Sequence, residues 1–107
     1  MDRAVPGGAA VRALAGLFEA IEAETPYGGR SVTYEPVGSA WLKLGARRRR
    51  ERTEAGVTRG VETVTAETRS DPRLTVGRVL RFGGTDWRIK TVESVGGRAI
   101  LTLERMR

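Results

Sequence analysis

Residues 78–104 of this chain, RVLRFGGTDWRIKTVESVGGRAILTLE, decide its fold. Their central part, residues 87–92, alternates apolar and polar side chains, which is the period of a half-buried strand. Glycine pairs interrupt the pattern on both sides, and glycine supplies the positive φ that a tight hairpin needs. The turn residues are Gly83, Gly84, Gly96 and Gly97. The stretch therefore predicts an antiparallel meander, with strands close to residues 78–82, 87–92 and 99–104.

Two further strands are predicted upstream of the meander. Residues 60–69 are rich in threonine and valine, whose β-branched side chains favour a pleated surface. Residues 30–45 form a long pattern of alternation that Pro36 and Gly38 interrupt, and Gly28 and Gly29 form a turn before it. A small closed barrel uses a long bent strand of this kind to pass from one side to the other. We expect one mainly β domain over residues 1–107, an antiparallel barrel or sandwich of about six strands.

The N-terminal segment gives a different signal. Val11, Leu14, Leu17 or Phe18, and Ile21 recur every three to four residues, as on one face of a helix. Alanine and glutamate are frequent there, and both favour helix. Pattern and propensity alone therefore predict a helix over residues 9–23.

The composition removes most catalytic and metal-binding chemistry. The chain has neither histidine nor cysteine, so it lacks the commonest general base, the thiol nucleophile and the usual zinc ligands. We therefore expect no enzyme activity, no catalytic residues, no metal and no cofactor. No apolar run approaches the roughly 18 residues of a membrane span, and the first residues do not have the pattern of a secretory signal. We expect a protein that stays in the cell that made it or in a particle assembled there.

Positive charge is concentrated in one short segment. The formal net charge is +6, and residues 46–60 contribute +4 of it. Residues 46–58 show no apolar period, which predicts a long loop between the second and third strands that stays outside the core. Such a loop can be simply solvated, can face phosphates, or can dock on an acidic protein surface. The candidate residues are Arg47, Arg48, Arg49, Arg50, Glu51, Arg52, Glu54 and Arg59.

The two tryptophans have two interpretations. Trp41 and Trp87 could stack on bases, as aromatic side chains do in oligonucleotide-binding barrels. Both lie among apolar residues in predicted strands, so we assign them to the core together with Leu42 and Leu101. The glycine pairs could be imagined as phosphate-binding loops, but none leads into a helix, and they are assigned as hairpin turns.

The order of these motifs resembles the phage head–tail joining family, also called head-closure or stopper proteins. The resemblance covers roughly residues 14–106. It rests on a Gly-Gly turn at Gly28 and Gly29, an aromatic-rich strand that reaches Trp41, an arginine-glutamate pair at Arg50 and Glu51, and the meander after Gly77. The family also occurs in phage-like gene transfer agents. Its first element is a strand, so we predict a strand within residues 16–24, preceded by a loose arm over residues 1–13.

The resemblance implies a structural role. Members form a homo-oligomeric ring around the DNA channel in the neck of the virion, between an adaptor protein below the portal and the tail terminator. Assembly takes place in the bacterial cytoplasm. Carried onto this sequence, the loop that faces the channel is residues 46–58, and it is more basic than is usual in the family. The alternative from charge alone is a stand-alone small-barrel protein that binds nucleic acid.

Overall fold

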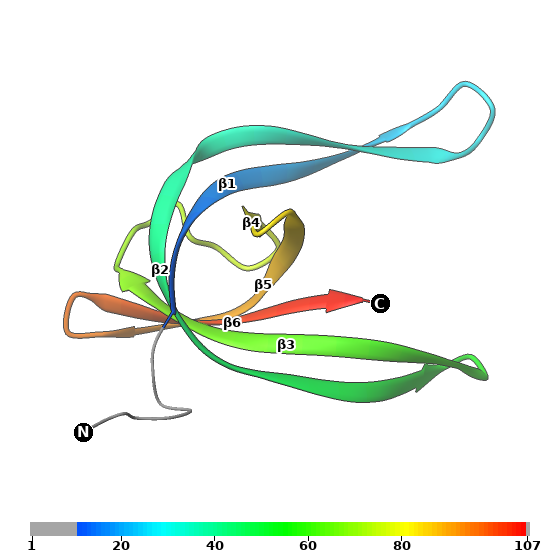
Figure 1. The fold of residues 1–107 in the computed structure, drawn as a ribbon. Helices are drawn as coiled ribbons and strands as arrows, with labels where there is room; N and C mark the ends of the chain where they lie inside the picture. The colour runs from blue at the N-terminus through cyan, green and yellow to red at the C-terminus, as the bar shows by residue number, and fades with distance from the viewer. Residues whose placement is uncertain (1–10, 107) are drawn as a thin grey trace.

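The computed structural model describes residues 11–106, which form a single antiparallel sheet of six strands. The sheet closes on itself as a barrel in the order β1-β2-β3-β6-β5-β4 (Figure 1). This architecture confirms the predicted small, mainly β fold. The strands are β1 (Val11–Glu24), β2 (Arg30–Glu54), β3 (Val57–Arg69), β4 (Val79–Phe82), β5 (Thr85–Val95) and β6 (Arg98–Met106).

Closure of the barrel depends on one short pairing. Gly16–Phe18 of β1 pairs with Val79–Arg81 of β4, and this pairing joins the first strand of the chain to the C-terminal meander. The meander itself, β4 to β6, has the predicted strands and turns. Both glycine pairs at its turns have positive φ, from 54° to 80°, as two-residue hairpins require. The sequence prediction was therefore correct where local turn chemistry determines the structure.

Residues 11–24 form a strand and not a helix. Ala13, Ala15 and Leu17 alternate toward the interior, where the last two are buried. A register shift opposite Leu17 and Phe18 leaves one extra residue, Val37, in β2 and changes which residues of β2 face inward. The helical spacing was therefore misleading, because the paired strands β2 and β4 override the propensity of a short segment. Of the predicted N-terminal arm, residues 11–13 belong to β1, and the remainder lies outside the described residues.

The predicted loop at residues 46–58 is wrong. β2 continues to Glu54, and a two-residue turn at Ala55 and Gly56, with φ of 51° and 78°, leads directly into β3. Pairing between β2 and β3 satisfies the backbone groups that the two strands turn toward each other. Successive side chains of a strand point to opposite faces, so arginines on one face are about 7 Å apart and repel one another less than in a compact loop.

The interior is filled from all six strands and from the β3–β4 connection. Trp87, Leu42 and Leu101 lie there, fully buried. Trp41 does not, because it points to the opposite face of β2 from Leu42 and its side chain is 64% exposed. Its assignment to the core was therefore wrong. The buried cluster comprises Ala15, Leu17, Leu42, Val64, Ala66, Leu74, Leu80, Phe82, Trp87, Ile89, Ala99, Leu101 and Leu103.

Two arginines fasten the β3–β4 connection to the barrel, one by a hydrogen bond and one by an ion pair. The Asp71 carboxylate accepts hydrogen bonds from the side chain and the backbone N–H of Arg73, and these bonds lower the pKa of Asp71 to about 2. Arg73 also donates to the carbonyl oxygen of Val37 in β2 at 3.2 Å. Arg78 bonds to Glu19 of β1. The connection is therefore attached to both β1 and β2, and its Leu74 lies in the core.

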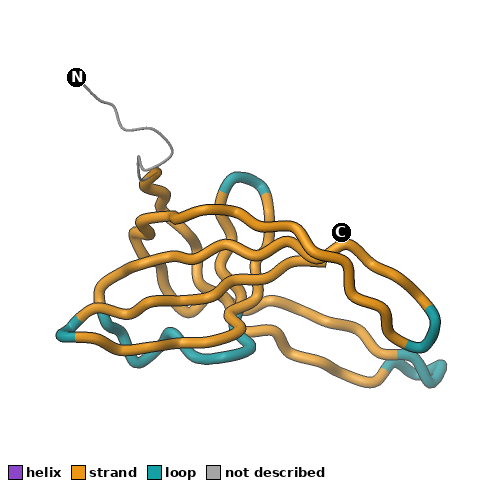
Figure 2. The backbone as a smooth tube through the Cα atoms, turned by 90° about the horizontal axis from the view of Figure 1, so that it is seen from below, coloured by secondary structure: helices purple, strands orange, loops and turns teal. Residues whose placement is uncertain are grey.

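Two hairpins extend far beyond the barrel on the same side (Figures 1 and 2). One joins β1 to β2, and its strands have no third strand beside them past Phe18. The other joins β2 to β3, and β6 accompanies it only as far as Val61. These projections give the chain extents of 60 × 33 × 24 Å. The surfaces of these two hairpins lie well away from the core, and hydrogen bonds between paired backbones keep the hairpins in shape.

The core assignment predicts unequal effects for two leucines. Leu101→Ala removes a side chain with no exposed surface and should lower the free energy of unfolding by about 2–5 kcal/mol. Leu14→Ala removes the same atoms from a side chain that is 55% exposed, and should change it by less than about 1 kcal/mol. Urea unfolding of both variants measures the difference. Equal losses would contradict this description of the core.

Candidate functional site

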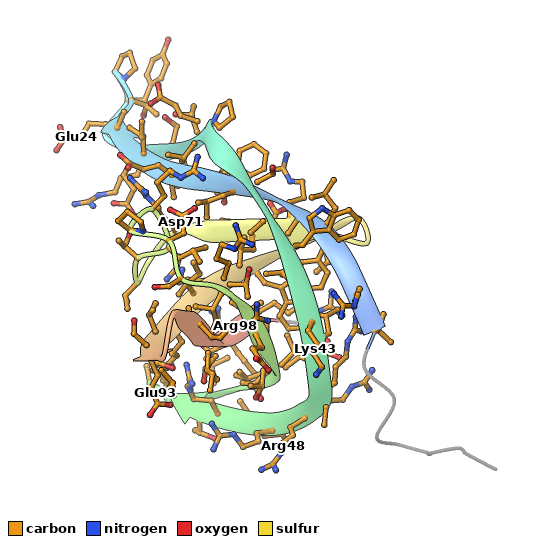
Figure 3. All side chains as sticks on the ribbon, turned by 90° about the vertical axis from the view of Figure 1, so that its left-hand side faces the viewer. Glu24, Lys43, Arg48, Asp71, Glu93 and Arg98 are labelled. Atoms are coloured by element: carbon orange, nitrogen blue, oxygen red, sulfur yellow. The ribbon has the colours of Figure 1, made fainter. Side chains whose placement is uncertain are left out.

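The arginine run lies on the β2–β3 hairpin, which we call the arginine hairpin (residues 47–64). Arg47 pairs with Val64 and Arg50 with Val61, so the run sits at the root of the hairpin, next to the barrel. A register shift between Leu44 and Arg47 precedes it. Because side chains alternate along a strand, the run is divided between two faces. Figure 3 shows Arg48 at the outer edge of the molecule.

On one face, arginines converge on the buried carboxylate of Glu62. This glutamate of β3 is only 3% exposed. Arg105 of β6 approaches it at 2.7 Å, while Arg47 and Arg49 of β2 lie at 3.8 and 3.9 Å. A buried carboxylate requires compensating charge, and here three guanidinium groups supply it. The cluster ties β2, β3 and β6 together.

The same arginines cover the central aromatic residue of the core. The guanidinium carbons of Arg47 and Arg105 each lie 5.4 Å from the centre of the Trp87 ring, within cation–π range. Phe82 stacks on Trp87 at 5.8 Å with the planes 6° apart. The Trp87 Nε1 group is buried and has no hydrogen-bond partner among the described residues. Arg47 thus contacts both Glu62 and Trp87, although 56% of its side chain remains exposed.

Arg52 takes part in a second ion-pair cluster. Its Nη2 donates to Oε2 of Glu104 at 2.9 Å, and the Lys90 ammonium lies 3.5 Å from the same oxygen. Partial burial alone would raise the pKa of Glu104, but the hydrogen bond from Arg52 and the charge of Lys90 outweigh it and hold that pKa below its ordinary value. Arg52 is therefore also engaged within the fold.

The cations of the hairpin that remain available are Arg48, Arg50 and Arg59. All three are exposed, and none forms an ion pair with a described side chain. Glu51 and Glu54 are exposed on the same hairpin, again without an ion pair inside residues 11–106. The eight predicted residues are thus brought onto one hairpin, but only some of its arginines point to solvent with their charge unused. Such a surface attracts phosphate or carboxylate groups.

Sequence reasoning missed the residues that divide the run. Glu62 has the same parity along β3 as the buried Val64 and Ala66, so a carboxylate on the apolar face of a strand was the available signal. Arg105 and Glu104 are far away in the sequence and come near only through the pairing of β3 with β6. Nothing local in residues 46–58 indicates these partners.

Other kinds of site find no support in the described part of the chain. It contains no group of three or more residues that could hold a metal ion. No helix among these residues is long and apolar enough to span a membrane.

The fold has a relative of known structure. It is similar to a chain in the virion of a native gene transfer agent particle, with a TM-score of 0.66. The two chains are 22% identical, and the match covers 88% of this chain and 93% of that chain. No protein-family model and no curated protein matches this sequence. At this identity the likeness establishes a shared fold that extends over nearly the whole of both chains.

The arrangement around Glu62 predicts a selective loss of stability. Glu62→Gln keeps the shape but removes the charge that the three guanidinium groups share, and should lower the free energy of unfolding by about 1–3 kcal/mol. Glu67→Gln is the matched control, because its pair with Arg98 is exposed on both sides and should contribute at most about 1 kcal/mol. Denaturant unfolding provides both values, and a larger loss in the control would refute the role given to Glu62.

Proposed function

We propose that this chain is a structural protein of a tailed phage or phage-like particle, and that within it the chain acts as a connector, or stopper, between the DNA-filled head and the tail. The observation that carries the proposal is the fold shared with a chain of a gene transfer agent virion over 88% and 93% of the two chains. The order of motifs that resembles head–tail joining proteins supports the same assignment independently of the coordinates.

In this proposal several copies form a ring around the DNA channel. Each copy contributes its available arginines, Arg48, Arg50 and Arg59, to the surface that faces the packaged DNA. Contacts with phosphates need no base readout, which suits DNA of any sequence passing through the channel. A ring multiplies the charge of each copy into a continuous positive band. Charge held on a paired hairpin is also better positioned than charge on a loop.

The proposed neighbours follow from that place in the particle. The ring would contact an adaptor protein below the portal on one side and the tail terminator on the other. Its location is the neck of the virion, reached by assembly in the bacterial cytoplasm. The chain would act through these contacts and through DNA, with no chemical step of its own.

Removal of the protein tests the connector role. Particles produced without this chain should lose their DNA after packaging or fail to acquire tails, because the joint between head and tail is missing. Electron microscopy and nuclease protection of particle DNA measure both defects, and the wild-type gene supplied in trans should restore them. Filled, tailed and infectious or transducing particles from the deletion strain would overturn the proposal.

A charge reversal tests the arginine hairpin separately. Arg50→Glu should reduce the DNA retained in particles, because it places a carboxylate where the proposal puts phosphates. Arg88→Glu is the matched control: it makes the same charge change at another exposed arginine, on β5, that has no ion pair among the described side chains. Equal DNA retention in the two variants would contradict the proposal that the arginine hairpin faces the DNA channel.

Oligonucleotide binding by the isolated chain, together with the deletion strain, separates the connector from a stand-alone nucleic-acid binder. A stand-alone binder predicts about micromolar affinity of the isolated chain for oligonucleotides, falling steeply with salt. The connector requires only the weaker contacts that a ring adds together. Tight binding by the isolated chain, with particles unaffected by its deletion, would favour the binder.

A further inference from the structure

A groove opens where β2 and β3 diverge. The two strands pair at Lys43 and Glu67, and beyond this point β2 continues without β3 beside it. The groove has a volume of about 430 Å³ and is lined by residues of β1, β2, the end of β3 and the start of β6. We call it the basic groove, after Arg12, Lys43 and Arg69 in its lining.

The chemistry of the basic groove is that of a protein-binding surface. Trp41 lies in its lining with 64% of its side chain exposed, directly across from the exposed Leu14 of β1. Arg12 of β1 pairs with Lys43 of β2. This pair lies two residues along from Leu14 and Trp41, on the same face of the sheet. These two cations form no ion pair with any described side chain. An exposed tryptophan beside unpaired cations is the usual composition of an interface hot spot.

The complementary surface lies on the β1–β2 hairpin, residues 19–35, which we call the acidic arm. The arm carries four glutamates and one arginine, and Tyr27 at its tip is 97% exposed. Glu24 and Glu35 have no ion-pair partner among residues 11–106. No side chain of the arm is buried, and a two-stranded ribbon is marginally stable in water by itself. A partner that covers the arm would stabilise it.

The arm and the groove of one chain cannot meet. The arm extends to the right in Figure 1, whereas Lys43 and Arg98 face the viewer in Figure 3, which looks at the left-hand side of that view. In Figure 3, Glu24 lies at the upper left, apart from both cations. A surface at one end that matches a different surface at the other end produces head-to-tail association.

We infer that the acidic arm of one copy docks in the basic groove of the next copy. Tyr27 supplies the aromatic contact to Trp41, and Glu24 beside the arm tip faces Arg12 and Lys43. Glu35, on the other face of the arm, adds to its negative charge. The inference rests on the proposed function, because it supplies the contact by which copies join into the ring. A head-to-tail contact of this kind closes a ring when its rotation allows closure.

Single-stranded nucleic acid is the competing occupant, since tryptophan and cations also bind stacked bases and phosphates. One feature favours a second copy. The acidic, aromatic-tipped arm is present on every copy in equal number with the groove.

Charge reversal tests the contact in the purified full-length chain. The groove variant is Arg12→Glu with Lys43→Glu, and the arm variant is Glu24→Lys with Glu35→Lys; all four positions are exposed, and circular dichroism verifies that each variant folds. Sedimentation over a concentration series should show self-association weakened about tenfold or more in either variant. A mixture of the two variants should again grow to larger species, because the arm of each variant is complementary in charge to the groove of the other. The four substitutions combined should restore growth to larger species.

Cysteine cross-linking gives a second readout, since the natural sequence has no cysteine. Pro26→Cys at the arm tip combined with Ser39→Cys in the groove lining should give a ladder of disulfide-linked species on mild oxidation. Either substitution alone can give no more than a dimer. A ladder supports the inference, and a double variant that stops at the dimer overturns it.

Three results would overturn the inference. One is self-association unchanged by both charge reversals. Another is a wild-type chain that stays monomeric up to about 1 mM together with a double cysteine variant that gives no ladder. At that concentration even a weak contact of about 4 kcal/mol would be visible. The third is an oligonucleotide that binds with loss of affinity on Trp41→Ala while no ladder forms. The proposed function is tested separately. If disulfide-linked ladders form but particles do not need the gene, only the connector role is wrong. If particles need the gene but no ladder forms, only the docking of arm in groove is wrong.

Discussion

A carboxylate buried at the rim of the barrel, that of Glu62, fixes the positions of residues on three strands. Arg105, Arg47 and Arg49 reach it from β6 and β2, and two of these guanidinium groups also lie over the ring of Trp87. Without the carboxylate, like charges would face one another above an apolar core. With it, the barrel gains an end that is closed by charge and aromatic stacking together. The long β2–β3 hairpin projects from this closed end.

This arrangement gives the arginine run two tasks that the linear sequence cannot separate. Alternation along β2 turns Arg47 and Arg49 toward Glu62, and it turns Arg48 and Arg50 to the opposite face, where neither forms an ion pair with a described side chain. The first pair holds the hairpin in place, and the second presents charge from a fixed position. In a connector, the charge that meets DNA would therefore be anchored in each subunit by charge of the same kind.

How far the sequence predicts this structure depends on how local the signals are. The meander was predictable, because alternation and glycine pairs act within a few residues. The strand at residues 11–24 was not, since its partners lie in β2 and in the distant β4. The arginine run showed no period because its inward face is made of arginines and its neutralising groups, Glu62 and Glu104, belong to other strands. Trp41 was assigned to the core although it alternates with Leu42, so the parity of the strand already indicated its exposure.

Residues 11–106 contain no group of three or more side chains that could hold a metal ion. Their distinctive surfaces are an acidic arm, a basic groove and an arginine hairpin, set at different places on one small barrel. Each is of little use to an isolated monomer. The most direct test of the central claim, that the protein is a connector ring, is electron cryo-microscopy of the assembled particle from its source. The account predicts a closed ring of this chain in the neck, with arginine hairpins bordering the DNA channel. A particle whose neck is complete without density for this chain would contradict it.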